Sequence, residues 1–308
     1  MGKKALVLSG GSIKGAFQAG AVKAVLETSF APEIITGISV GSLNGTLIAN
    51  EAGRQKRNNQ TPDWPGIGKY VYEFWANYMT RPESVVLKRK KLSILSQFLR
   101  KRFQGFTDSK PIDYLIDQTV DVDNLSASDI ELAVGTVNFA DAKITYAEPS
   151  SPGFKEYLKA SKAIPFIMQC IDISGHPYAD GGLRDSAPLK TTIRKGASEI
   201  ICILNHSREL AGISINAGNA IALAQRIMDI HINETVNNDI EYADYCNRFL
   251  PDDGSPKPDE PFLGYRKIKI TVIRPETEVI LDLQTFTKKE IHETMQSGYH
   301  TARKILNA

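Results

Sequence analysis

Short apolar runs alternate along the chain with longer segments of helical periodicity. Residues 4–9, 33–36 and 200–204 are apolar runs, typical of strands that are buried on both faces of a parallel sheet. Residues 16–29 and 219–248 instead carry apolar side chains at the three- and four-residue spacing of helices. This alternation predicts an α/β fold with a mainly parallel sheet.

Weaker signals fill in the rest of the chain. Further strand-like segments are residues 130–139, 143–147, 171–174, 177–179, 267–273 and 278–282. Further helical segments are residues 70–78, 112–116, 152–164 and 287–306. Residues 51–68 are polar and rich in Pro and Gly, which predicts a surface loop. We expect residues 1–308 to form a single domain, with a cap or insertion around residues 51–128.

Composition narrows the class of protein. The formal net charge of +2 provides no general attraction to nucleic acid. The three cysteines are far apart and lack a spacing that would hold zinc, so neither a disulfide scaffold nor a metal or other cofactor is expected. The first apolar run ends at residues 9–11, too early for a signal peptide, and no stretch is long enough to span a bilayer. We expect a cytoplasmic protein, and its oligomeric state stays open.

Residues 81–106 have the most uneven charge of the chain. They hold eight basic residues and a single acidic one, Glu83, and leucines interleave with the basic clusters. Three interpretations stay open at this point. The segment is a packed helix with a solvated basic face, a peripheral contact with an anionic membrane, or a lid over an apolar substrate.

Ser39 lies in the stretch around which the chain is organised. Gly37-Ile38-Ser39-Val40-Gly41 follows a predicted strand and precedes the helix-compatible residues 42–49. A serine at such a sharp turn exposes its hydroxyl in front of a helix N-terminus, and flanking glycines permit the tight bend. The motif alone is weak, because an ordinary glycine-rich turn has the same pattern. Ser39 is nevertheless the candidate nucleophile.

A glycine-rich loop follows the first predicted strand. Residues 10–15 read Gly-Gly-Ser-Ile-Lys-Gly and lead into a helix. The order Lys14-Gly15-Ala16 does not fit a phosphate-binding P-loop, and Ser12 stands where a dinucleotide fingerprint needs glycine. Backbone N–H groups at a helix N-terminus also stabilise a developing oxyanion, and the residues permit this third use.

Asp180-Gly181-Gly182 follows the predicted hairpin at residues 171–179. The two glycines let the backbone pass close to another loop while the carboxylate points into the space they leave. The tripeptide is also common in plain turns. Taken together, the serine turn, the N–H-rich loop and this Asp provide the nucleophile, the oxyanion donors and the base that acyl transfer requires.

These residues resemble the patatin-like phospholipase family. Residues 8–20 resemble the family's oxyanion segment, residues 37–41 its G-x-S-x-G motif and residues 180–182 its D-G-G/A motif. Residues 160–165, Ala-Ser-Lys-Ala-Ile-Pro, are similar to a helix-ending signature of the family. The resemblance is strong over residues 4–204 and weaker through the closing helix.

The resemblance implies a three-layer α/β/α sandwich and a serine lipid acyl hydrolase of the phospholipase A or lysophospholipase type, without a metal. It implies that Ser39 attacks the ester carbonyl and that Asp180 is the base of a dyad that lacks histidine. The implied oxyanion loop comprises Gly10, Gly11, Ser12, Lys14 and Gly15. The implied motif-supporting residues are Gly37, Gly41, Gly181 and Gly182.

The sequence departs from the family pattern at two positions. Ser12 stands where a third glycine is common, and Ser186 stands where an Asn is frequent. Both departures leave the catalytic groups in place, so they concern substrate preference and rate. The dyad also poses a chemical difficulty, because a carboxylate of ordinary pKa is a poor base for a serine hydroxyl.

Other functions use the same sequence features. A Ser-Asp-His triad is permitted by chain order, because His206, His231, His292 and His300 follow Asp180, although only one predicted strand precedes the serine. An acyltransferase or a general carboxylesterase would use the same dyad. A non-catalytic lipid-binding module would rely on residues 81–106 instead.

Overall fold

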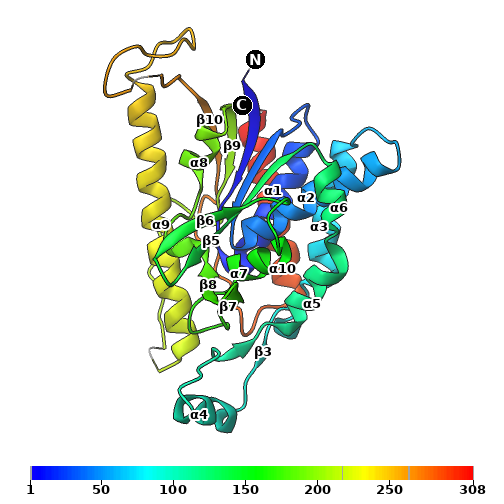
Figure 1. The fold of residues 1–308 in the computed structure, drawn as a ribbon, viewed down its shortest axis with the longest axis vertical. Coiled ribbons are helices and arrows are strands. Elements are labelled where there is room, and N and C mark those ends of the chain that lie inside the picture. Colours follow the sequence, from blue (N-terminus) through cyan, green and yellow to red (C-terminus); the bar gives the residue numbers. More distant parts are fainter. Residues whose placement is uncertain (1, 217, 263, 308) are drawn as a thin grey trace.

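A computed structural model describes residues 2–216, 218–262 and 264–307. Eight strands form one sheet in the order β10-β9-β1-β2-β5-β8-β7, and β6 also pairs with β5. The strands are β1 (Lys3–Leu8), β2 (Ile34–Ile38), β5 (Glu131–Asn138), β6 (Lys143–Ala147), β7 (Ile171–Ile173), β8 (His176–Asp180), β9 (Ala197–Ile203) and β10 (Lys269–Ile273). Figure 1 shows the sheet running through the middle of the molecule.

The sheet is parallel from β10 to β5 and antiparallel beyond it. β1 pairs in parallel with β2 and β9, β9 with β10, and β2 with β5. β6 and β8 run antiparallel to β5, and β7 antiparallel to β8. The connection from β5 to β6 is too short for a crossover, which explains the change of direction. The predicted α/β fold with a mainly parallel sheet is confirmed.

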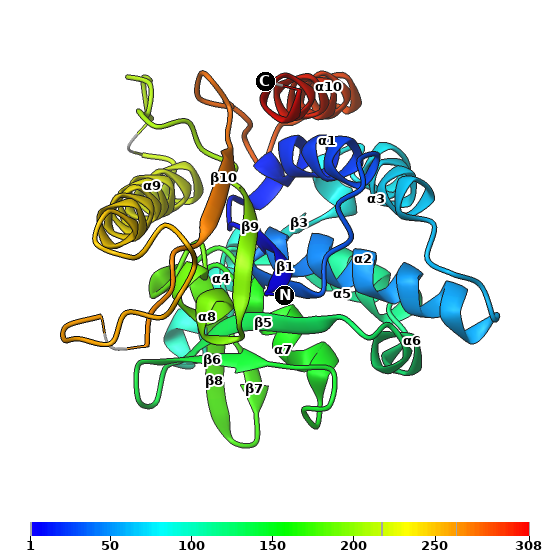
Figure 2. The same ribbon diagram turned by 90° about the horizontal axis from the view of Figure 1, so that it is seen from above.

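Helices cover both faces of the sheet, as the view from above shows (Figure 2). One face carries α1 (Gly15–Leu26), α2 (Val40–Arg57), α3 (Trp64–Tyr78) and α10 (Lys288–Leu306), and the other carries α8 (Leu189–Arg194) and α9 (Ala220–Asn247). The remaining helices are α4 (Lys91–Leu99), α5 (Lys110–Thr119), α6 (Val122–Ala127) and α7 (Phe154–Ser161). The chain therefore forms the three-layer sandwich that the family resemblance implies.

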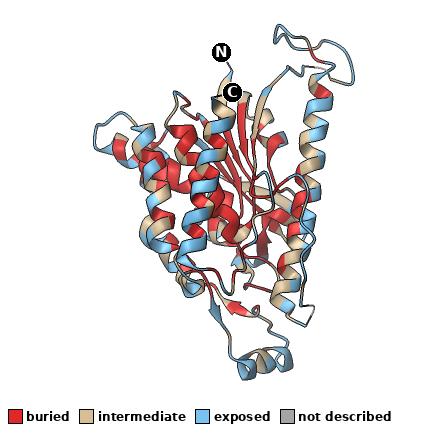
Figure 3. Cartoon of the chain, turned by 180° about the vertical axis from the view of Figure 1, so that it is seen from behind, coloured by how far each residue is buried: buried red, intermediate tan, exposed pale blue. Residues whose placement is uncertain are grey.

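Side chains of β1 alternate between the two cores. Leu6 and Leu8 belong to the larger apolar cluster on the α1 face, whereas Ala5 and Val7 belong to the cluster under α8 and α9. Figure 3 shows these central strands as the most completely buried part of the chain. Because β1 and β2 are parallel neighbours, the loops that follow them emerge at the same edge of the sheet.

Two expectations about secondary structure are wrong, and one helix is shorter than expected. Residues 51–68 are mostly helical, because α2 continues to Arg57 and α3 begins at Trp64. Residues 278–282 are not a strand. The helix expected over residues 152–164 is α7, which ends at Ser161. The closing helix is confirmed, and Thr287 and Glu290 form the predicted cap as a reciprocal capping box.

Residues 87–108 form a small hairpin that extends beyond the end of the sandwich (Figure 1). β3 (Leu87–Lys88) pairs with β4 (Thr107–Asp108), and α4 lies between them. No residue of α4 is buried, so it is not the packed helix of the first interpretation. Within the described residues, the length and apolar character needed to cross a bilayer are not combined in any helix.

Candidate active site

Ser39 occupies a strained turn between β2 and α2. Its φ of 55° and ψ of −123° lie outside the regions that non-glycine residues usually adopt. A Cβ at Gly37 would lie 2.5 Å from the backbone of Gly41, and a Cβ at Gly41 would lie 2.1 Å from the carbonyl oxygen of Leu8. Gly37 therefore lets the turn itself be tight, and Gly41 lets the turn pack closely against β1.

Asp180 ends β8 at the same edge of the sheet. Its side chain accepts a 2.8 Å hydrogen bond from the backbone N–H of Gly182. A Cβ at Gly181 would lie 2.5 Å from the carbonyl oxygen of Gly135 in β5, so the first glycine allows the loop to pass close to the neighbouring strand. Ser39 and Asp180, which are 141 positions apart, line one small pocket together with Gly11 and Ser12.

Burial controls the acidity of Asp180. The side chain is almost completely buried, and this desolvation raises its pKa to about 6. The neighbouring Ser39 side chain, the Gly182 N–H and the ammonium group of Lys162 act in the opposite direction and limit the rise in pKa. The carboxylate is therefore a stronger base than an exposed Asp, yet it is mostly ionised at neutral pH.

The segment from Ser161 to Ala163 joins the two candidate catalytic residues. The Ser161 hydroxyl accepts a 2.9 Å hydrogen bond from the Ser39 N–H and donates a 2.6 Å bond to the Gly135 carbonyl. Two residues further, the carbonyl of Ala163 accepts a 3.0 Å bond from the Asp180 N–H. Sequence reasoning singled out residues 160–165 only as a signature and did not assign Ser161 a role.

The glycine loop after β1 supplies N–H groups beside Ser39. Gly11 has a φ of 150° and Ser12 a φ of 52°, and their N–H groups donate to no other group in the part of the chain that the structure describes. The N–H of Gly10 donates to the carbonyl of Ser186, and that of Gly15 donates to carbonyls of its own turn. In this structure the N–H groups of Gly10 and Gly15 therefore already have acceptors, unlike those of Gly11 and Ser12.

Gly10 and Gly15 are needed for close approach instead. A Cβ at Gly10 would lie 3.5 Å from the Cβ of Ser39, and one at Gly15 would lie 2.3 Å from a methyl group of Val40. Asn205, just after β9, also holds this loop, since its side-chain amide donates 3.1 Å hydrogen bonds to the carbonyls of Ser9 and Gly10. The sequence contains no signal that would identify Asn205.

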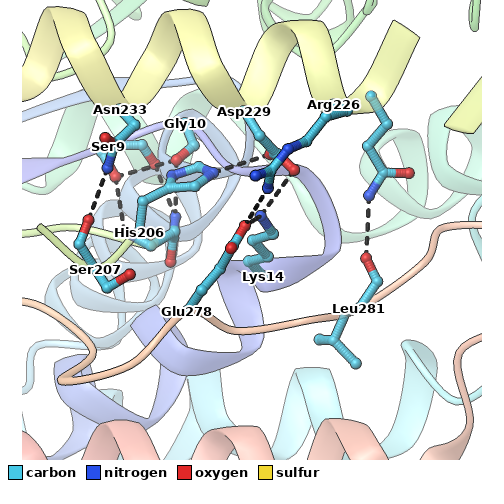
Figure 4. Close-up of polar contacts among 12 residues, drawn as sticks. Ser9, Gly10, Lys14, His206, Ser207, Arg226, Asp229, Asn233, Glu278 and Leu281 are labelled. Atoms are coloured by element: carbon cyan, nitrogen blue, oxygen red, sulfur yellow. Dashed lines mark hydrogen bonds and ion pairs between the residues drawn. The ribbon is translucent and has the colours of Figure 1, made fainter. Parts of the chain in front are cut away.

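Lys14 reaches into a buried ion cluster with α9, and its partner Asp229 also lines the pocket of Ser39 and Asp180 (Figure 4). Its Nζ lies 2.9 Å from Asp229 and 3.7 Å from Glu278, and Arg226 lies 2.8 Å from the same Glu278. Asp229 is also 2.9 Å from His206 Nε2. Lys14 thus anchors the glycine loop to α9 and supports it electrostatically.

The charge states of this cluster follow from burial and pairing. Burial lowers the pKa of His206, so the imidazole is neutral at physiological pH. Burial alone would raise the pKa of Asp229, but hydrogen bonds from His206 and Lys14 keep it below its usual range. A buried Lys-carboxylate network therefore fixes α9 against the first loop.

None of the four histidines that chain order permits as a triad member lines a pocket with Ser39. His206 is bonded to Asp229, and His231 lies 3.2 Å from the carbonyl of Leu183. Within the described residues, no group of three or more His, Cys, Asp or Glu side chains could hold a metal ion. The geometry therefore gives no support to a Ser-Asp-His triad.

A second, apolar pocket opens beside Ser39. It is about 50 Å³ in volume, and its apolar lining includes Leu43, Trp75, Met79, Ile112, Leu158 and Met168. Lys162, paired with Asp113, is the charged side chain of this wall, and burial lowers its pKa. One water needs only about 10–15 Å³ by the same measure, so this space is large enough for several water-sized groups.

Several known proteins are similar to this chain. YjjU of Escherichia coli, an uncharacterised protein, is 24% identical over 66% of this chain and 52% of its own length. Lysophospholipase nte1 of Aspergillus oryzae is 25% identical over 64% of this chain, and patatin-like phospholipase domain-containing protein 7 of Mus musculus is 26% identical over 71%. The matches span only 11% and 14% of these two longer proteins.

A solved structure and a family profile complete the comparison. VipD from Legionella pneumophila covers 100% of this chain and 67% of its own chain, with a TM-score of 0.47 and 14% identity, a similarity too weak to bear on function. The profile of the patatin-like phospholipases matches residues 6–193, which include the glycine loop, the serine turn and Asp180. This chain belongs to the patatin-like phospholipase family.

Proposed function

We propose that this protein hydrolyses acyl esters of lipids through a dyad of Ser39 and Asp180. The observation that carries the proposal is that both side chains line one pocket with Gly11 and Ser12, whose N–H groups have no acceptor among the described residues. Names of similar proteins, among them a lysophospholipase of Aspergillus oryzae, support a lipid ester as the substrate. The apolar pocket next to Ser39 supports an acyl chain as the part that is bound.

The proposed reaction has two steps. In the first, the Ser39 hydroxyl oxygen attacks the ester carbonyl while Asp180 accepts its proton, and the N–H groups of Gly11 and Ser12 stabilise the oxyanion. Collapse of the tetrahedral intermediate releases the alcohol, which takes the proton from Asp180, and leaves an acyl-enzyme. In the second step, Asp180 deprotonates a water that releases the fatty acid and restores Ser39.

The raised pKa of Asp180 supports its role as the base. An ordinary Asp, with a pKa near 3.8, has little tendency to accept a proton from serine at neutral pH. Burial raises the pKa to about 6, closer to neutral pH and still low enough to keep most of the group ionised there. The higher pKa makes Asp180 a better base for the serine hydroxyl than an ordinary carboxylate, which is the property that a dyad without histidine needs.

A panel of lipids tests the proposal. We expect wild-type protein to release fatty acid from at least one of phospholipids, lysophospholipids, glycerides and short esters, and Ser39→Ala and Asp180→Asn to release none. Both variants should retain the wild-type circular dichroism spectrum. Fatty acid release that persists in Ser39→Ala would refute the serine mechanism. The single-domain arrangement with a cap around residues 51–128, and a cytoplasmic location, stay predictions.

A further inference from the structure

The hairpin of residues 87–108, here called the basic hairpin, presents an apolar face without a partner. Leu92, Leu95 and Leu99 of α4 are 84%, 59% and 77% exposed, and their spacing places them on one side of the helix. Figure 3 shows α4 without a buried residue at the end of the molecule. Three exposed leucines on one short helix form an apolar patch that requires an explanation.

The hairpin is folded, so the exposure of the leucines is not the result of a frayed segment. Phe98 stacks on Phe103 with ring centroids 4.8 Å apart, and Phe103 contacts Phe106 edge-on at 5.2 Å. The N–H of Arg102 donates to the Gln97 carbonyl after the last turn of α4. These ring contacts join α4 to the segment that follows it, and Phe98 is itself 55% exposed beside the leucines.

Cations flank the leucines on both sides. Residues 87–106 contain seven basic and no acidic residues. Arg89 lies 3.8 Å from Asp108, whereas the other six have no carboxylate partner in the described parts of the chain. These six cations are Lys88, Lys90, Lys91, Arg100, Lys101 and Arg102. A leucine face between basic clusters matches the interface of a bilayer that contains anionic lipids.

The hairpin is joined directly to the wall of the apolar pocket. The N–H of Phe106 donates to the Phe166 carbonyl, and the N–H of Thr107 donates to the Ile167 carbonyl at 2.9 Å. Met168, the next residue, lines the apolar pocket with Ser39. Phe166 is itself 65% exposed. Any partner or membrane that contacts α4 would therefore lie close to residues 166–168, the segment that leads into the pocket wall.

We propose that the basic hairpin docks this protein on an anionic lipid surface, with Leu92, Leu95 and Leu99 inserted among the headgroups. The cations contact the lipid phosphates and carboxylates, and the apolar pocket is held at the membrane, where acyl esters are concentrated. This inference rests on the proposed lipid acyl hydrolysis for its purpose, although docking itself is measurable without turnover. It selects the peripheral membrane contact from the interpretations of residues 81–106.

Vesicle cosedimentation tests docking in a Ser39→Ala background, where lipid turnover does not interfere. The vesicles are phosphatidylcholine with and without phosphatidylserine. Two variants address the hairpin: Leu92, Leu95 and Leu99 all replaced by Ser, and Lys88, Lys90 and Lys91 all replaced by Gln. The matched control replaces Arg266, Lys267 and Lys269 by Gln, because these exposed cations lie at the opposite end of the parallel strands.

We expect the parent protein to bind the vesicles with phosphatidylserine and to lose binding as salt increases. Neutralising three lysines should weaken binding about a hundredfold, from roughly fivefold for each cation. The leucine variant should weaken it at least about tenfold, and the control should bind as the parent does. Equal binding by parent and hairpin variants, equal binding to neutral vesicles, or no binding to either kind of vesicle would overturn the proposal.

Hydrolysis assays with active Ser39 separate this inference from the proposed function. With active protein, the hairpin variants should lose release of fatty acid from vesicles and retain hydrolysis of a soluble short ester. If wild-type protein binds vesicles through the hairpin but hydrolyses no ester, the proposed function fails and docking holds. If the wild-type protein hydrolyses the soluble ester but the hairpin variants bind vesicles as well as the parent does, the docking proposal fails and the proposed function stands.

Discussion

The hydroxyl of Ser161 accepts a 2.9 Å hydrogen bond from the backbone N–H of Ser39. It also donates to the Gly135 carbonyl at 2.6 Å and lies 2.8 Å from the hydroxyl of Ser42. All three contacts are buried, and they hold Ser39 in a backbone conformation that costs energy. Ser161 thus acts as a positioning residue for the turn.

Replacing Ser161 by alanine should therefore lower kcat and change KM little. The change leaves the Ser39 N–H and the Gly135 carbonyl buried without their partner, a loss of ~1–3 kcal/mol, equivalent to roughly 5- to 150-fold in rate if it falls on the transition state. Steady-state kinetics on a soluble ester measure the effect. Ser126→Ala removes an exposed helical serine as the control, and a kcat equal to that of the control would contradict the positioning role.

Activity should depend on pH through Asp180. The base must be ionised to accept the Ser39 proton, and burial raises its pKa to about 6. We expect kcat/KM to rise about tenfold per pH unit below that value and to level off above it. Activity that stays constant as the pH falls well below 6 would show that Asp180 does not act as the base.

Asp180→Asn should stabilise the protein at neutral pH while it abolishes hydrolysis. A carboxyl group whose pKa is raised in the folded state contributes most to stability below its unfolded pKa of 3.8, and this contribution is lost as pH rises through about 6. Above pH 6 the buried charge therefore costs up to about 3 kcal/mol, which the neutral Asn avoids. Urea unfolding at pH 7.5 and at pH 5 measures the gain.

The gain in Asp180→Asn should shrink as the pH falls towards 5, because the native carboxyl then becomes protonated. The Asn side-chain oxygen can still accept the hydrogen bond from the Gly182 N–H. Loss of that bond therefore does not contribute to the difference in stability between the variant and wild type. A variant less stable than wild type at pH 7.5 would contradict the view that burial of Asp180 is unfavourable.

Lys14→Met should destabilise the fold strongly. Removing the ammonium group leaves Asp229 and Glu278 buried without it, and breaking a buried pair in this way typically costs about 3–5 kcal/mol. Lys289→Met, which removes a surface pair with Glu293, is the matched control and should cost at most about 1 kcal/mol. Equal unfolding free energies for the two variants would show that the cluster does not anchor the loop.

The sequence predicted the candidate site where the signal is local. Gly37 and Gly41 flank Ser39 because the turn is tight and packs closely against β1, and these requirements are visible as a short motif. Asp180 could be recognised because its two glycines follow it directly. The residues that orient these groups, Ser161 and Asn205, act through contacts that join distant segments, so no spacing in the sequence identifies them.

Composition misled the prediction where Pro and Gly serve helix geometry and packing. Pro65 lies in the first turn of α3, where a helix does not need its N–H. A Cβ at Gly68 would lie 3.0 Å from the Cα of Lys23, so that glycine lets α3 approach α1 closely.

Residues 278–282 look like a strand, but Leu281 packs into the core while its carbonyl accepts a hydrogen bond from Gln225 of α9.

The most direct test of the central claim is mass spectrometry after treatment with a fluorophosphonate, which reacts with activated serines. We predict a single adduct on Ser39, slower labelling in Asp180→Asn and none in Ser39→Ala. An adduct on another serine, or ester hydrolysis by a protein whose Ser39 stays unlabelled, would contradict the proposed dyad.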